Sequence, residues 1–212
     1  MDGSGAFLAT MPPAAAARHA AVRQALPQGR LTLYGVIDAA VDERLFGLLQ
    51  AEPVQSQMCC LYSGRAAVRY ARHAPYLFAV HTESPLYLRW LDEGWLAHWG
   101  ILLAGTTAKA EPIQRHLKRF LQATDARGRT VWVRFYDPRV LPDLLSRMDY
   151  RYRLDWFGDG LVHTCMVPTR SGLWCATTAY KNTVRRIVGA PHMDARLLPL
   201  PLPLPGSPPP CN

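Results

Sequence analysis

Arg134-Phe135-Tyr136-Asp137-Pro138-Arg139-Val140-Leu141 is the stretch that decides the fold, because strand-like sequence changes to helix-like sequence within it. From Val131 to Tyr136, β-branched and aromatic residues alternate in the two-residue period of a strand. Asp137 is a preferred cap of a first helical turn, and Pro138 suits the first helical position. The stretch therefore predicts a strand that runs directly into a helix, with Asp137 and Arg139 at the strand's carboxyl end. A plainer interpretation stays open, in which Asp137 is only a cap and the arginines are only solvated.

Outward from this stretch, apolar runs of strand length alternate with helical patterns. Strands are expected at residues 31–38, 58–62, 76–80 and 99–104. Helices are expected after Asp42, after Ser84-Pro85, over 113–121 and after the opening stretch, where Pro142 predicts an irregular first turn or a later start. Residues 161–167 and 173–178 predict a terminal hairpin. Together these elements predict an α/β fold, a mixed sheet with helices packed on it and a closing β-hairpin.

Three parts are expected along the chain. Residues 1–29 are rich in alanine, and a short helix within 14–26 would bury little, so a mobile, disordered leader is predicted. Residues 30–189 are predicted to form a single α/β domain with a sizeable core. Residues 190–212 form a Pro-rich tail, because the eight prolines from Pro191 onward favour an extended, disordered segment that does not pack.

The composition predicts a soluble, basic protein. Of 212 residues, 49% are apolar and 19% charged, as in ordinary globular domains, whereas the net charge of +8 favours an acidic partner. The five cysteines lack zinc-ligand spacing, which is typical of a reduced cytosolic protein; whether Cys165 and Cys175 face each other across the hairpin stays open. Because the sequence lacks a bilayer-spanning run and a good signal peptide, we expect a cytoplasmic location.

The sequence contains no recognisable catalytic, metal-binding or cofactor-binding motif. His81, Glu83 and Ser84 have the chemical types of a triad, but Ser84 is better explained as a helix cap. The three tryptophans between residues 90 and 99 have the spacing of core residues rather than of a binding platform. We therefore expect no catalytic residue, no cofactor and no metal, and a binding role rather than an enzymatic one.

Three stretches together resemble a known family. They are residues 33–40 (LYGVIDAA), residues 84–100 (from Ser-Pro through Trp-Leu and Gly-Trp to His-Trp-Gly) and residues 134–141. Their order and spacing are similar to those of the type VI secretion effector chaperones and adaptors, the family of the domain of unknown function 4123. The resemblance covers residues 31–158, and Pro142 and the Pro-rich tail depart from it.

The resemblance implies a non-enzymatic chaperone or adaptor of the bacterial cytoplasm. Such a protein binds a cognate secreted effector and helps to load it onto the trimeric valine-glycine-repeat spike of the secretion system; neither nucleic acid nor a membrane is an expected partner. The predicted partner-binding residues are basic, namely Arg134, Arg139, Arg115 and Arg119. The predicted structural motif consists of Trp99, Gly100, Asp137 and Pro138.

Two alternatives from other functional classes stay open. One is a small hydrolase-like enzyme with an unidentified substrate, which would use His81 or His98. The other is a basic nucleic-acid-binding domain, whose affinity would fall steeply with salt concentration.

Overall fold

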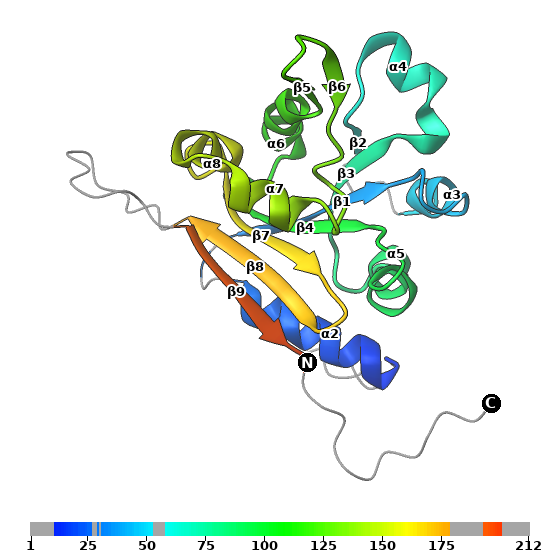
Figure 1. The fold of residues 1–212 in the computed structure, drawn as a ribbon. Coiled ribbons are helices and arrows are strands. Elements are labelled where there is room, and N and C mark those ends of the chain that lie inside the picture. The colour runs from blue at the N-terminus through cyan, green and yellow to red at the C-terminus, as the bar shows by residue number, and fades with distance from the viewer. Residues whose placement is uncertain (1–10, 27–28, 30, 53–57, 179–192, 201–212) are drawn as a thin grey trace.

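The computed structural model describes residues 11–26, 29, 31–52, 58–178 and 193–200 (Figure 1). In these residues a sheet of seven strands has the order β2-β3-β1-β4-β7-β8-β9. Its strands are β1 (Thr32–Asp38), β2 (Cys59–Cys60), β3 (Pro75–Ala79), β4 (Gly100–Gly105), β7 (Val162–Pro168), β8 (Gly172–Thr178) and β9 (Met193–Pro199). The predicted α/β class and closing hairpin, β7–β8, are confirmed.

The sequence predicts a mixed sheet, whereas every pairing of the described strands is antiparallel. The reason lies in the position of β1. A crossover joins β3 to β4, but these two strands do not pair, because β1 lies between them and runs opposite to both. The alternation of strands and helices along the chain therefore does not produce parallel neighbours.

Helices cover both faces of the sheet (Figure 1). The elements on one face are α2 (Pro13–Ala25), α3 (Leu45–Gln50), α5 (Pro85–Arg89) and its π-helical continuation η2 (Trp90–Gly94). Those on the other are α6 (Ala110–Leu117), the 3-10 turn η3 (Lys118–Phe120), α7 (Leu141–Arg147) and α8 (Tyr150–Phe157). Along β1, Leu33 and Ile37 face the first group and Tyr34 and Val36 the second. The central strands are mostly apolar because both faces of the sheet are buried.

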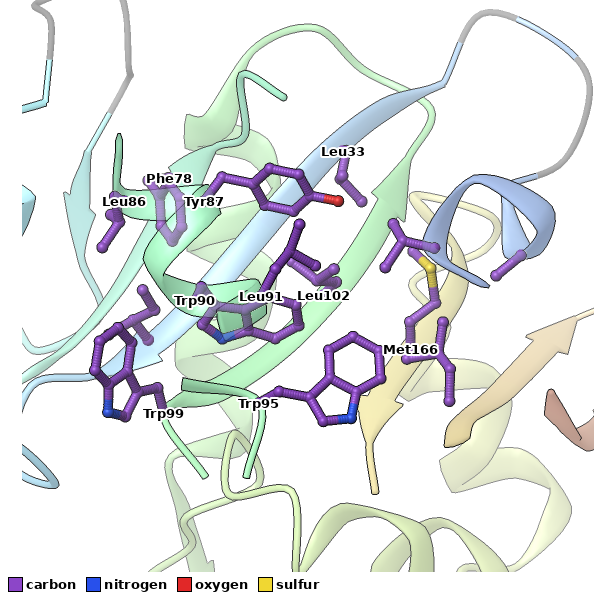
Figure 2. Close-up of a cluster of buried hydrophobic side chains, with 14 of the residues drawn as sticks. Leu33, Phe78, Leu86, Tyr87, Trp90, Leu91, Trp95, Trp99, Leu102 and Met166 are labelled. Carbon is purple, nitrogen blue, oxygen red and sulfur yellow. The ribbon is translucent and has the colours of Figure 1, made fainter. Parts of the chain in front are cut away.

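The core beneath α2 and α5 is rich in aromatic rings (Figure 2). Trp90 and Trp95 meet edge to face with ring centroids 5.5 Å apart, and Tyr87 stacks on Trp90. Trp99 is buried beside them. The prediction that these tryptophans are core residues is confirmed. Ser84 is confirmed as the cap of α5, since its Oγ accepts a hydrogen bond from the Tyr87 N–H at 3.1 Å.

The prediction that the alanine-rich helix near the N-terminus buries little is wrong. Helix α2 is packed into the core, with Ala15, Ala21, Val22 and Ala25 all buried. Small side chains let the helix approach the sheet closely. Arg18 fixes it further, because its guanidinium donates to the carbonyl oxygens of the α5–η2 helix at Leu91 (2.6 Å) and Asp92 (2.8 Å). Residues 1–10 of the predicted leader lie outside the described residues.

The prediction that the chain does not pack beyond Pro191 is wrong for residues 193–199. They form β9, which pairs with β8 at the edge of the sheet and buries Leu198. Strand β9 tolerates Pro199 because this residue lies at the end of an edge strand. Residues 179–192 and 201–212 lie outside the described part of the chain.

Cys165 and Cys175 do not face each other. Cys165 pairs in register with Ala176, and Cys175 with Met166, so the two cysteines are offset by one residue across the β7–β8 hairpin. A shift of one residue reverses the face to which a side chain points. Cys165 therefore lies in the core on the α6 side and Cys175 in the core on the α2 side, and both are free thiols.

The strand expected to run directly into a helix at Asp137 is shorter than predicted. Strand β6 (Thr130–Trp132) ends before the opening stretch and pairs only with β5 (Gln122–Thr124), in a separate two-stranded hairpin. Residues 135–140 form turns, and α7 begins at Leu141 with Pro142 in its first turn. Asp137 is thus not the cap of α7, and it does not lie at the end of a strand of the large sheet.

Candidate functional site

The candidate site begins at Asp38, the last residue of β1. Its carboxylate is buried; Oδ1 accepts the Ala40 N–H at 3.0 Å and Oδ2 accepts a hydrogen bond from Arg134 Nη2. The Arg134 side chain is 46% exposed although its partner carboxylate is only 3% exposed. Burial lowers the pKa of Arg134, but the hydrogen bond and the charge of Asp38 outweigh this effect and raise it. Arg134 is therefore a charged side chain that the buried Asp38 carboxylate holds in place and that is partly exposed to solvent.

Asp137 and Arg139 form a second pair of the same kind. Asp137 Oδ1 accepts the backbone N–H and Nε–H of Arg139, both at 2.9 Å, and Oδ2 accepts Nη2–H at 2.7 Å. Burial raises the pKa of Asp137, but the hydrogen bonds from Arg139 outweigh burial, so that the pKa lies below its ordinary value. This carboxylate is ionised at neutral pH. Asp137 thus stabilises a turn and orients Arg139 instead of capping a helix.

The two ion pairs belong to one cluster. The charge of Arg134 also lowers the pKa of Asp137, and the charge of Asp38 also raises the pKa of Arg139. Each guanidinium keeps donors that its carboxylate does not use, and these donors face solvent because about half of each arginine side chain is exposed. Chemically, the cluster is suited to pairing with carboxylates or other planar anions of a partner.

Asp38 is also the point where the three stretches of the family resemblance meet. Its backbone N–H donates to the Trp99 carbonyl at 2.8 Å, and its side chain binds Arg134. Asp38 therefore bonds stretch 33–40 both to stretch 84–100 and to stretch 134–141. Asp38 was not among the predicted site residues; its position at the end of an apolar run was the available signal, but its partner lies 96 residues away in sequence.

Trp99 and Gly100, two residues of the predicted structural motif, lie in the interior of the fold. Trp99 is buried, and Gly100 lies where β4 meets β1. A Cβ atom at Gly100 would lie 1.9 Å from the Val36 carbonyl oxygen, so that a larger residue does not fit without backbone movement. Pro138 is buried in the turn that holds Asp137.

Arg115 and Arg119 lie apart from this cluster, on α6 and η3. Arg119 Nη2 binds the Asp155 carboxylate of α8 at 2.9 Å, and its guanidinium lies 5.7 Å from the Phe120 ring centroid. With Pro112 and His116, the two arginines line a shallow hollow. Within the described residues, no hydrogen bond or ion pair links them to Arg134 or Arg139. The structure therefore brings together two of the four predicted partner-binding arginines.

Of the residues considered for an enzymatic interpretation, Ser84 has a structural role. The Ser84 hydroxyl caps α5, and the Ser84 N–H donates to the His81 carbonyl in a turn. His81 and Glu83 are exposed at this turn. In the described part of the chain, no three His, Cys, Asp or Glu side chains are placed to hold a metal ion together. None of the helices in that part is both long and apolar enough to cross a membrane.

Comparison with known proteins gives one result. The family model of the domain of unknown function (DUF4123) matches residues 33–154. Neither a search of curated proteins nor a search of solved structures found a match. The matched segment includes β1 from its second residue onward, the aromatic core around η2, the hairpin β5–β6 and the Asp38–Arg134 and Asp137–Arg139 pairs. With more than half of its length matched by this model, the chain belongs to the family of the domain of unknown function 4123.

Proposed function

We propose that the protein is a non-enzymatic chaperone or adaptor of the bacterial cytoplasm. It binds a cognate secreted effector and helps to load this effector onto the trimeric valine-glycine-repeat spike of a type VI secretion system. The observation that carries the proposal is the pair of half-exposed arginines, Arg134 and Arg139, which buried carboxylates hold in place. Side chains that are ordered before binding lose little entropy in a complex, and arginine is enriched among the residues that dominate protein interfaces.

The family match supports this proposal. It covers all three stretches on which the resemblance to secretion chaperones and adaptors depends, and Asp38 bonds to the other two stretches from the first. The net charge of the chain, +8, agrees with an acidic partner surface.

The test is co-expression with the effector encoded beside this protein, followed by gel filtration of the purified mixture. We expect the two proteins to elute as one complex and the spike protein to join it when added. Arg139→Ala is expected to weaken the complex. Arg139→Lys keeps a positive charge beside Asp137 but loses the planar fork, so it is also expected to weaken binding while it preserves the fold.

Arg147→Ala is the matched control. Arg147 also pairs with an aspartate, Asp143, but both side chains are mostly exposed and lie on α7, outside the cluster. Its loss should leave the complex intact. If neither the neighbouring effector nor a spike protein co-elutes with the wild-type chain, the proposed function is wrong.

A further inference from the structure

Trp132 is a large aromatic residue that lies on the surface and not in the core. Of the six tryptophans, all of which lie in the described residues, Trp132 alone is classed as exposed, at 57%. It belongs to the β5–β6 hairpin, whose strand residues are all exposed. Its ring meets the Tyr62 ring edge to face, with centroids 5.2 Å apart. The indole is thus supported from one side and available for contact on the remainder of its surface.

Trp132 lies next to the cluster formed by Arg134 and Arg139. Val133 extends the hairpin ladder by donating its N–H to the Leu121 carbonyl at 2.9 Å, and its side chain packs on the core. Because side chains alternate along extended chain, Trp132 and Arg134 lie together on the opposite, outer side. Tyr62 contacts the Trp132 ring, and it also lies near Tyr136: burial raises the pKa of Tyr136, and the charge of Asp38 and Tyr62 raise it further.

The charge around Trp132 is strongly positive. Residues 58–73 and 125–140 contain seven arginines and two acidic residues, Asp125 and Asp137. Each of these aspartates is bonded to an arginine of the same segment, Arg129 and Arg139 respectively. Helix α4 (Gly64–Arg69), which follows Tyr62, has no buried residue and carries two of the arginines on exposed positions. A partner that covers this region is therefore expected to be acidic.

We propose that Tyr62, Trp132, Arg134 and Arg139 form a docking surface for an acidic segment of the effector, here called the Trp132 surface. An apolar side chain of that segment packs on the Trp132 indole, and carboxylates on either side of it pair with Arg134 and Arg139. The inference rests on the proposed function and specifies its contact surface. Tryptophan, tyrosine and arginine are the residues that most often dominate protein interfaces, and a central aromatic anchor with surrounding charges is the usual arrangement.

A protein segment fits this surface better than a nucleic acid does. Proteins that bind single strands present a series of aromatic platforms along a basic groove, whereas this surface has one exposed indole. On the partner, one apolar side chain would lie between carboxylates. On this surface, one indole lies beside two guanidinium groups that are held in place, so the two patterns match.

The experiment measures the affinity of the full-length protein for the purified neighbouring effector by isothermal titration calorimetry. Trp132→Ala is expected to raise Kd by at least about tenfold. Tyr152→Ala is the matched control, because Tyr152 is an aromatic residue of α8 that is 66% exposed and lies outside the surface; its Kd should stay at the wild-type value. Overlapping peptides from the effector then identify the bound segment, which should carry carboxylates on both sides of an apolar residue.

Each result decides the matter. If the wild-type chain binds the effector and Trp132→Ala binds equally well, or if the bound peptides are basic or lack carboxylates, the Trp132 surface is wrong while the proposed function stands. If the wild-type chain does not bind the effector, both proposals are wrong. A fluorescent single-stranded oligonucleotide serves as the competitor: Trp132-dependent binding of this probe, with displacement of the effector, would assign the surface to nucleic acid and overturn the inference.

Discussion

Replacing Asp137 with alanine removes a buried carboxylate that accepts three hydrogen bonds from Arg139, one from the backbone and two from the guanidinium. An aspartate that satisfies backbone N–H groups in this way contributes about 0.5–2 kcal/mol, and a hydrogen bond to a charged group about 1.5–3 kcal/mol. Arg139 is 58% exposed, so water re-solvates it in the variant and only part of this energy is lost. We expect the free energy of unfolding to fall by about 2 kcal/mol. For a chain of this size, Tm should fall by roughly 4–8 °C.

Thermal unfolding followed by circular dichroism measures this shift, with Asp143→Ala as the control. Asp143 accepts a hydrogen bond from Arg147 Nε at 2.8 Å, a length similar to those at Asp137, but its side chain is 64% exposed. Exposed ion pairs contribute little to stability, so Asp143→Ala should keep the wild-type Tm. The two substitutions remove the same chemical group and differ in burial. Equal Tm values for the two variants would refute the reasoning that a buried Asp137 stabilises the turn.

Acid should destabilise the wild type more than Asp137→Ala. Burial raises the pKa of Asp137, but the hydrogen bonds and charge of Arg139 outweigh burial and lower the pKa below its ordinary value. The carboxylate therefore stabilises the fold above its unfolded pKa, and this contribution is lost as pH falls through the folded pKa. Parallel losses of Tm in the two proteins between about pH 6 and pH 3 would contradict this. Leu198→Ala should lower Tm by several degrees and Leu197→Ala should not, because Leu198 is 8% exposed and Leu197 47%; equal effects would show that β9 does not pack as described. Gly100→Ala should abolish soluble folded protein because its Cβ would lie 1.9 Å from a β1 carbonyl, whereas Gly47→Ala in α3 has open space and should raise Tm slightly; a wild-type melting curve for Gly100→Ala would be the contrary result.

The sequence predicted correctly those helices and strands whose formation depends on residues close together in the chain. Ser84-Pro85 begins α5 because a hydroxyl cap and a proline act within a single turn. The apolar runs that became β1 and β4 were recognisable because strands buried on both faces need apolar residues at every position. The opening stretch shows where such signals stop being sufficient: Asp137 has the preferences of a cap, yet its carboxylate accepts the N–H groups of Arg139 and the helix begins four residues later.

The parts that sequence reasoning missed depend on partners far away in the chain. An alanine-rich helix has a weakly apolar face, and only the shape of the sheet and of η2 beneath α2 gives it enough contact. From its sequence, β9 was predicted to be part of a proline-rich tail, and its pairing with β8 was not predicted. At the site, Arg134 and Arg139 were predicted from their position in one stretch, whereas Asp38, which connects that stretch to the sheet, was not.

The packing of α2 has a consequence for folding during synthesis. Helix α2 is made before every strand of the large sheet, yet the elements it contacts include β7, β8 and β9, the last three strands of that sheet in chain order. The face of the sheet that carries the aromatic core can therefore be closed fully only when β9 has emerged from the ribosome. Until then, the nascent protein exposes the large apolar surface on which α2 will lie, and an extension fused to the N-terminus would have to leave this late docking step free.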